Sequence, residues 1–152
     1  MKNKDKNKKK HKKILAILIG PPGSGKSYYC QHTLYNYERI SQDDYGKAHY
    51  RKFLQFLLDG KEHLVIDRMG FSIEQRLRFV LPARRFGYKI TYYIFKAPYY
   101  LLIKRLRERK DHPTVNSKDY KKHKEIIEFF QNAYEEPQLY ECDELNEVKT
   151  GE

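Results

Sequence analysis

Hydrophobic residues gather in short blocks along the chain, and these blocks predict the strands of a sheet. A continuous apolar run at 14–19 (ILAILI) is typical of a parallel strand that is buried on both faces. Residues 63–66 predict a second buried strand, and the β-branched and aromatic residues of 88–95 predict a third. Shorter strands are expected at 39–41 and, at an edge of the sheet, near 145–148.

The segments between these strands carry apolar residues at helical spacing, and punctuating residues suggest where the helices stop. Asp59-Gly60 is a typical helix end. Pro82 is expected to kink its helix or to end it early, whereas Pro98 suits the first turn of another. The predicted helices lie at about 26–35, 50–58, 72–87, 98–109 and 120–134.

This alternation of strands and helices predicts an α/β fold, a parallel sheet of about five strands covered on both sides. We expect one domain over 14–152. The basic segment 1–13 (MKNKDKNKKKHKK) has too little apolar surface to order itself and is expected to be a flexible tail. In such folds ligands bind beyond the carboxyl ends of the strands. Gly20, Asp43 and Asp67 all fall at those ends.

Composition narrows the class of protein. The 152 residues carry a net charge of +11, which favours a polyanionic partner such as nucleic acid unless the charge is mostly that of the solvated tail. Cys30 and Cys142 are too few for a disulfide framework or a zinc site, so a reducing cytoplasm is expected. No apolar stretch is long enough for a signal peptide or a membrane span, which predicts a soluble protein.

The strongest motif follows the first strand, where residues 20–27 (GPPGSGKS) match the phosphate-binding loop G-x-x-x-x-G-K-[ST]. Its backbone amides and the following helix N-terminus suit a triphosphate, Lys26 suits the β- and γ-phosphates, and the Ser27 hydroxyl suits Mg²⁺. ATP and Mg²⁺ are therefore the predicted cofactors. The predicted nucleotide ligands in this loop are Gly20, Pro22, Gly23, Ser24, Gly25, Lys26 and Ser27.

Three further segments follow in order: SQDDY at 41–45, VIDRMGF with EQR at 65–71 and 74–76, and RLRER at 105–109 with HPT at 112–114. Together with the loop, this ordered set resembles the 5'-hydroxyl polynucleotide kinase family of P-loop phosphotransferases over most of 14–145. The resemblance implies the three-layer P-loop kinase fold with an arginine-bearing helical lid.

The resemblance also implies roles for the acceptor side. Asp43 would be the general base that takes the proton of the attacking 5'-hydroxyl, with helix capping by Asp43 and Asp44 as the alternative. Asp67 would help bind the acceptor end, the alternatives being Mg²⁺ through water or a structural carboxylate. Arg68 and Arg76 would meet acceptor phosphates, unless each is a solvated surface charge.

On the donor side the resemblance implies a lid in which Arg105 and Arg109, one helical turn apart, clamp the phosphates as catalytic and nucleotide-binding residues. The alternative is an amphipathic helix with a basic outer face. Two positions depart from the family pattern. Gly46 stands near the place of an arginine that grips the acceptor phosphate, and Gly70 stands where asparagine is common.

These observations favour an ATP- and Mg²⁺-dependent kinase that phosphorylates 5'-hydroxyl ends of DNA or RNA, in nucleic-acid end repair in the cytoplasm, away from membranes. It would act alone or with separate phosphatase or ligase proteins. Two alternatives stay open. A P-loop kinase of nucleosides or other metabolites would share every phosphate-handling residue, and a nucleotide-binding module would hold the nucleotide without transfer.

Overall fold

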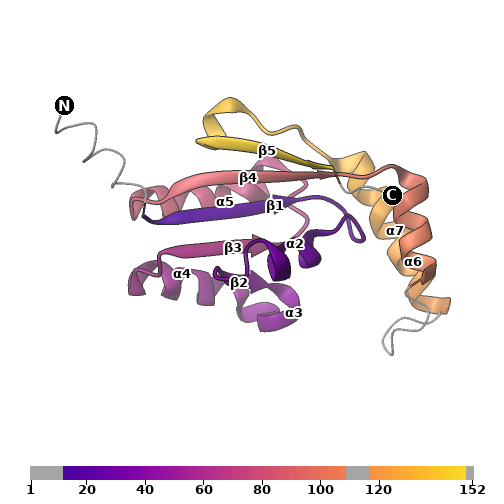
Figure 1. Ribbon diagram of the computed structural model, residues 1–152, viewed down its shortest axis with the longest axis horizontal. Helices are drawn as coiled ribbons and strands as arrows, with labels where there is room; N and C mark the ends of the chain where they lie inside the picture. Colours follow the sequence, from indigo (N-terminus) through magenta and orange to yellow (C-terminus); the bar gives the residue numbers. More distant parts are fainter. Residues whose placement is uncertain (1–11, 109–116, 150–152) are drawn as a thin grey trace.

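A five-stranded parallel sheet forms the centre of the molecule (Figure 1). The computed structural model describes residues 12–108 and 117–149, without the side chains of Asp43 and residues 117–119. In this part of the chain the strand order is β2-β3-β1-β4-β5, and every neighbouring pair runs parallel. This confirms the predicted fold class. The strands are β1 (Ile14–Ile19), β2 (Glu38–Ser41), β3 (His63–Asp67), β4 (Lys89–Lys96) and β5 (Glu144–Lys149).

The helices follow the predicted alternation with two differences. α5 runs through Pro82 to Arg85, so the early end predicted at that proline is wrong. A short helix, α3, follows β2 directly and was not predicted. Gly60, at φ 72°, ends α4 as the sequence suggested. The helices are α2 (Lys26–His32), α3 (Gln42–Tyr45), α4 (His49–Asp59), α5 (Ile73–Arg85), α6 (Tyr99–Glu108) and α7 (Ser117–Ala133), with 3-10 turns at Gly46–Ala48 and Leu139–Glu141.

Side chains of β1 alternate between two apolar layers, as the two-residue period of a strand requires. Leu15 and Ile17 point towards α4 and α5, where Phe53 and Phe79 close the larger cluster. Ala16 and Leu18 point to the opposite face of the sheet. Cys30 of α2 and Leu34, which lies just after that helix, cover this face. The central strand is therefore buried on both sides.

Helices α6 and α7 form a separate unit beyond the carboxyl ends of the strands (Figure 1). Leu102 and Leu106 of α6 pack against Ile127 of α7 in a small cluster of their own. These two helices contact each other more than they contact the sheet. They lie over the edge of the sheet where the strands end (Figure 1). This arrangement matches the lid that the resemblance implied.

A buried ion pair fixes α5 to the chain after α7. The Arg76 guanidinium donates to the Glu141 carboxylate at 2.8 Å and to the Gly70 carbonyl at 2.8 Å, and both ionic side chains have no exposed surface. Tyr92 adds a hydrogen bond of 3.0 Å to the same carboxylate. A side chain so enclosed has no surface for an acceptor phosphate, so the structure contradicts the prediction that Arg76 binds substrate.

None of the described helices is long and apolar enough to cross a bilayer. Cys30 is buried and Cys142 is half-buried, and both are free thiols.

Candidate phosphate-binding cleft

The loop between β1 and α2 has the conformation that a phosphate cradle needs. Gly23 and Gly25 take φ values of 83° and 100°, in the left-handed region that favours glycine. A Cβ on Gly20 would lie 2.7 Å from the Ser24 hydroxyl oxygen. That buried hydroxyl donates to the Pro21 carbonyl at 2.7 Å and holds the turn closed. The loop glycines are thus required by backbone shape and by close packing.

Lys26, the first residue of α2, turns its ammonium group back into the loop and donates to the Gly20 carbonyl. Burial lowers the pKa of this lysine to about 8, although the nearby Asp67 carboxylate opposes that shift. A cation that has lost most of its water and has few anionic partners is well placed to gain energy from a phosphate.

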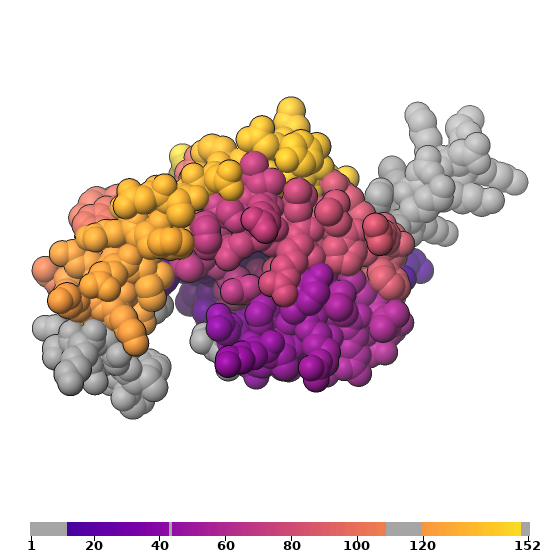
Figure 2. Space-filling model, turned by 180° about the vertical axis from the view of Figure 1, so that it is seen from behind, coloured from indigo at the N-terminus to yellow at the C-terminus, as the bar shows by residue number. Residues whose placement is uncertain are grey.

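A cleft of about 440 Å³ opens beside this loop. Figure 2 shows the surface hollowed between the orange α7 and the purple segment that contains α3. The walls come from the loop, the first turns of α2 and α3, the end of β3 and the inner side of α7. The lining residues are Pro22, Gly23, Gly25, Lys26, Ser27, Tyr28, Gln42, Asp67, Arg68, Met69, Gln75, His123 and Ile126.

The floor of the cleft joins the loop to the end of β3 through Asp67. Its Oδ2 accepts from Ser27 Oγ at 3.3 Å and from Arg39 Nε and Nη2 at 2.8 and 2.6 Å. The Ser27 hydroxyl, in the first turn of α2, and the Asp67 carboxylate, at the end of β3, are hard oxygen donors, the type that Mg²⁺ takes. These two residues therefore fit the expected metal, and the role of Asp67 in binding the acceptor stays a prediction.

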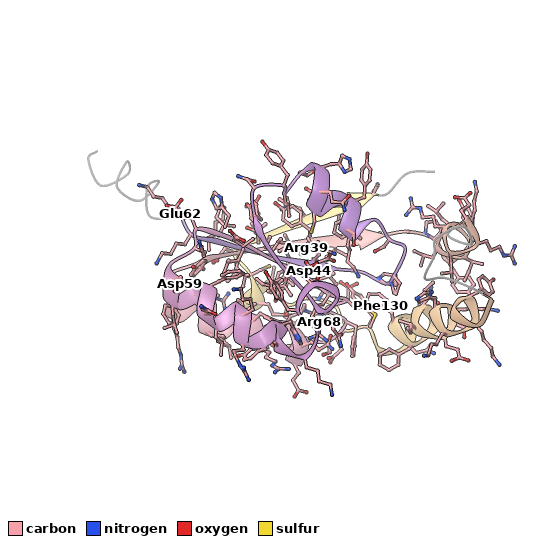
Figure 3. The ribbon with its side chains drawn as sticks, turned by 90° about the horizontal axis from the view of Figure 1, so that it is seen from below. Arg39, Asp44, Asp59, Glu62, Arg68 and Phe130 are labelled. Carbon is pink, nitrogen blue, oxygen red and sulfur yellow. The ribbon has the colours of Figure 1, made fainter. Side chains whose placement is uncertain are left out.

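Arg39 is a site residue that the sequence analysis missed. It also donates to Ser27 Oγ at 3.3 Å and to Asp44 at 3.2 Å, so one guanidinium links two carboxylates and the loop serine. Figure 3 shows Arg39 and Asp44 close together. The period of β2 was the available signal, because it places Arg39 on the same strand face as Ser41 and opposite the buried Ile40.

The Asp44 side chain, one of the acidic pair after β2, does not cap the N-terminus of α3 or of α4. Ser41 is the N-cap of α3, and its hydroxyl accepts from the Asp44 backbone amide at 3.1 Å. The next long helix, α4, has Ala48 at its N-cap and no side-chain cap. Asp43 is the second residue of α3, directly after the end of β2, and its side chain lies outside the described residues. The proposed base role of Asp43 stays a prediction.

Arg68 lines the cleft from the residue after β3, and a histidine holds it there. Its Nη1 lies 3.1 Å from His49 Nε2, while His49 Nδ1 lies 2.9 Å from the Gly46 carbonyl. Because arginine only donates and a carbonyl only accepts, these two partners require the neutral imidazole with its proton on Nδ1. Burial, with a contribution from Arg78, lowers the pKa of Arg68. No carboxylate among the described residues forms an ion pair with it.

The lid reaches the loop through Arg105, whose Nη1 donates to the Gly23 carbonyl at 2.8 Å. The second predicted lid arginine, Arg109, and the HPT segment at 112–114 lie outside the described residues. From α7 the lid contributes His123, whose Nδ1 is buried without a hydrogen-bond partner in the described part of the chain. His123 was not among the site residues predicted from the sequence.

Backbone geometry explains the two departures from the family pattern. Gly46 ends α3 with φ 54° and ψ −132°, a combination that side chains rarely adopt. Gly70 has φ 58°, and a Cβ there would lie 3.2 Å from the Leu18 carbonyl and 3.3 Å from an Ile19 side-chain carbon. Glycine is therefore needed at both places.

Solved structures with the same arrangement are P-loop kinases. A kinase candidate from Chloroflexus aurantiacus superposes with a TM-score of 0.65 at 16% identity, over 91% of this chain and 89% of that one. A gluconokinase from Sinorhizobium meliloti gives a TM-score of 0.58 at 15% identity, over 93% and 85%. The chain has the fold of the P-loop kinases.

A third structure with this P-loop kinase fold belongs to the Pnkp1/Rnl/Hen1 RNA repair complex. It gives a TM-score of 0.54 at 19% identity, over 82% of this chain and 47% of that one. No family model matches the chain. Among curated proteins, transcription factor bHLH140 of Arabidopsis thaliana is 38% identical over 82 residues, which is 47% of this chain. The chain covers 9% of that relative's length.

Proposed function

We propose that this protein is an ATP-dependent kinase that transfers the γ-phosphate to a 5'-hydroxyl end of DNA or RNA. One observation carries the acceptor side of the proposal. Arg68 lines the same cleft as the phosphate-binding loop and has a neutral histidine as its partner, which leaves its charge for a ligand anion. An acceptor that brings its own phosphate next to the reacting hydroxyl supplies that anion, and a nucleic-acid end has this chemistry.

The donor half of the site handles the triphosphate. The loop amides and Lys26 bind the β- and γ-phosphates, and Arg105 moves from the Gly23 carbonyl onto the phosphate oxygens when the nucleotide enters. His123 offers its unpartnered Nδ1 from the lid. Ser27 and Asp67 would hold Mg²⁺, which would supply charge neutralisation for the transferring phosphate.

The acceptor half orients the attacking hydroxyl. Arg68 binds the phosphate that follows the terminal nucleoside, and Asp43 accepts the proton of the 5'-hydroxyl. A bond forms between the 5'-oxygen and the γ-phosphorus while the bond from that phosphorus to the β–γ bridging oxygen breaks. ADP leaves with the electron pair of the broken bond, and the proton moves to the Asp43 carboxylate. The products are ADP and a 5'-phosphorylated end.

A transfer assay with labelled ATP tests the proposal across acceptors. Single-stranded, nicked and recessed 5'-hydroxyl oligonucleotides of DNA and RNA are compared with free nucleosides and sugars. We expect label on the oligonucleotides and little on the free nucleosides, which lack the phosphate that Arg68 binds. Arg68→Gln should raise the oligonucleotide KM about tenfold or more and leave the nucleotide affinity unchanged. Transfer to nucleosides or sugars alone would refute the polynucleotide acceptor.

A small-molecule kinase is the second candidate, and the superposition on a gluconokinase favours it. Such an enzyme would use the same loop, metal side and lid. The same acceptor assay separates the two functions, because a small-molecule kinase would label a free nucleoside or a sugar and leave the oligonucleotides unlabelled. A nucleotide-binding module would bind ATP and label no acceptor.

A further inference from the structure

The guanidinium of Arg39 lies among the oxygens that would bind the metal. Three of its nitrogens are used: Nε and Nη2 donate to Asp67 Oδ2, and Nη1 donates to Asp44 Oδ2. The oxygen of Asp67 that these nitrogens contact is also the one that accepts from Ser27. The cation thus pairs with the carboxylate oxygen that faces the phosphate-binding loop.

Arg39 also donates a hydrogen bond to the Ser27 hydroxyl oxygen. Nη2 donates to Ser27 Oγ at 3.3 Å, and the same hydroxyl donates its proton to Asp67 at 3.3 Å. A metal ion needs the electron pair that this hydrogen bond occupies and the negative charge that the guanidinium neutralises. Metal and Arg39 therefore compete for the same two oxygens.

The structure offers Arg39 a place to withdraw to. The Asp67 side chain is 4% exposed, the Arg39 side chain 28% and the Asp44 side chain 44%, so exposure to solvent rises from Asp67 through Arg39 to Asp44. Arg39 comes from β2, which is an edge strand with no neighbour on its outer side within the described sheet. A change of side-chain rotamer releases Asp67 while the ion pair with Asp44 keeps the guanidinium charge compensated.

We propose that Arg39 is a positioning residue that occupies the metal site when it is empty and moves outward to Asp44 when the metal–nucleotide complex binds. This inference rests on the proposed metal-dependent nucleotide binding. Arg39 keeps the buried Asp67 carboxylate compensated in the empty protein and lowers the affinity of the site for metal without nucleotide. Asp44 sets the balance, because it stabilises the outward position.

A direct measurement of metal affinity tests whether Arg39 competes with the metal and whether Asp44 stabilises the outward position of Arg39. Mn²⁺, which takes the same oxygen ligands as Mg²⁺, is titrated with detection by electron paramagnetic resonance, both alone and with ADP. Removing the competing cation in Arg39→Gln should tighten Mn²⁺ binding about tenfold or more, since charge-assisted hydrogen bonds no longer oppose it. Removing the outer partner in Asp44→Asn should weaken Mn²⁺ binding. Arg85→Gln, an exposed charge removal at the other end of α5, should leave it unchanged.

The opposite signs of the two variants distinguish Arg39 from a merely structural residue. Equal or weaker Mn²⁺ binding by Arg39→Gln would overturn the proposal. Should that variant fail to fold, tighter or unchanged Mn²⁺ binding by Asp44→Asn, whose side chain is nearly half exposed, would overturn it as well. A wild-type protein that binds ADP with Mn²⁺ while the variants behave alike would leave the kinase proposal standing and remove the role of Arg39. Failure of the wild-type protein to bind either would remove both.

Discussion

The buried pair of Arg76 and Glu141 allows a strict test of the claim that Arg76 serves the fold and not the substrate. Glu141→Ala removes the only described carboxylate that pairs with a guanidinium of zero exposure. It also removes the acceptor for Tyr92 and for the Gln138 amide. The loss of one partner from a buried ion pair costs about 3–5 kcal/mol, because the remaining charge keeps its desolvation penalty.

This cost is a large fraction of the 5–15 kcal/mol that usually separates folded from unfolded states. For a domain of this size it corresponds to a fall of about 6–20 °C in Tm. Urea unfolding followed by circular dichroism measures the free energy, and Glu144→Ala is the matched control. Glu144 pairs with Lys89 at the surface at 2.9 Å, with side chains 48% and 30% exposed, so its removal should cost little.

The double variant Arg76→Met/Glu141→Leu should recover most of the lost stability, because it leaves no unpaired charge in the core. Burial raises the pKa of Glu141, but the hydrogen bonds from Arg76 and Gln138 outweigh it and hold the pKa below its ordinary value of 4.5. The stabilisation from a lowered carboxyl pKa is complete above the unfolded value and disappears as the pH falls through the folded one. Wild-type stability should therefore fall in acid more steeply than that of the double variant. Loss of less than about 1 kcal/mol in Glu141→Ala would refute this reasoning.

Three further predictions concern the cleft and its backbone. Lys26 has a lowered pKa of about 8 and must be charged to bind phosphate, so ADP binding at about pH 9 should be accompanied by uptake of a proton. The affinity for ADP should fall towards tenfold per pH unit above about pH 8. Calorimetry in buffers of different ionisation enthalpy measures the proton uptake, and no uptake at about pH 9 would contradict the assignment. Gly70→Ala should lower the free energy of unfolding by roughly 2–4 kcal/mol and Gly46→Ala by about 1–2 kcal/mol. Both glycines have a positive φ, but only Gly70 is also crowded by neighbouring atoms. Equal losses of the two variants in urea unfolding would contradict this difference. His123→Ala should weaken ADP binding several-fold with little change in Tm, and unchanged affinity would place His123 outside the nucleotide site.

Much of this architecture was predictable because apolar periodicity reports burial directly. The run at 14–19 is buried on both faces because helices pack on both sides of the sheet, and the glycine loop has the left-handed backbone that its motif predicts. Short-range patterns failed where the local environment decided. Pro82 does not end α5 early, and two apolar residues of the helical segments, Leu58 and Leu81, are 74% and 52% exposed.

The errors at the site have one physical cause. A sequence shows which residues carry charge, but the partner of each charge depends on distant segments that the fold brings together. Arg76 was assigned to substrate because its carboxylate lies 65 residues further along the chain. Arg39 was overlooked because its contacts with Asp67 and Ser27 cross 28 and 12 residues. Local motifs identified the phosphate loop, and only the structure distinguished Arg39, the cation beside the cleft, from Arg76, the cation in the core.

The proposed phosphate transfer depends most on Asp43 acting as the general base rather than as a structural residue. The decisive measurement compares Asp43→Asn with the wild-type protein for ADP affinity and for single-turnover transfer of labelled phosphate to a 5'-hydroxyl oligonucleotide. We predict ADP affinity within about threefold and transfer slowed by about 10²–10⁴-fold, the usual contribution of a general base. Transfer at the wild-type rate with Asp43→Asn would contradict the proposed mechanism.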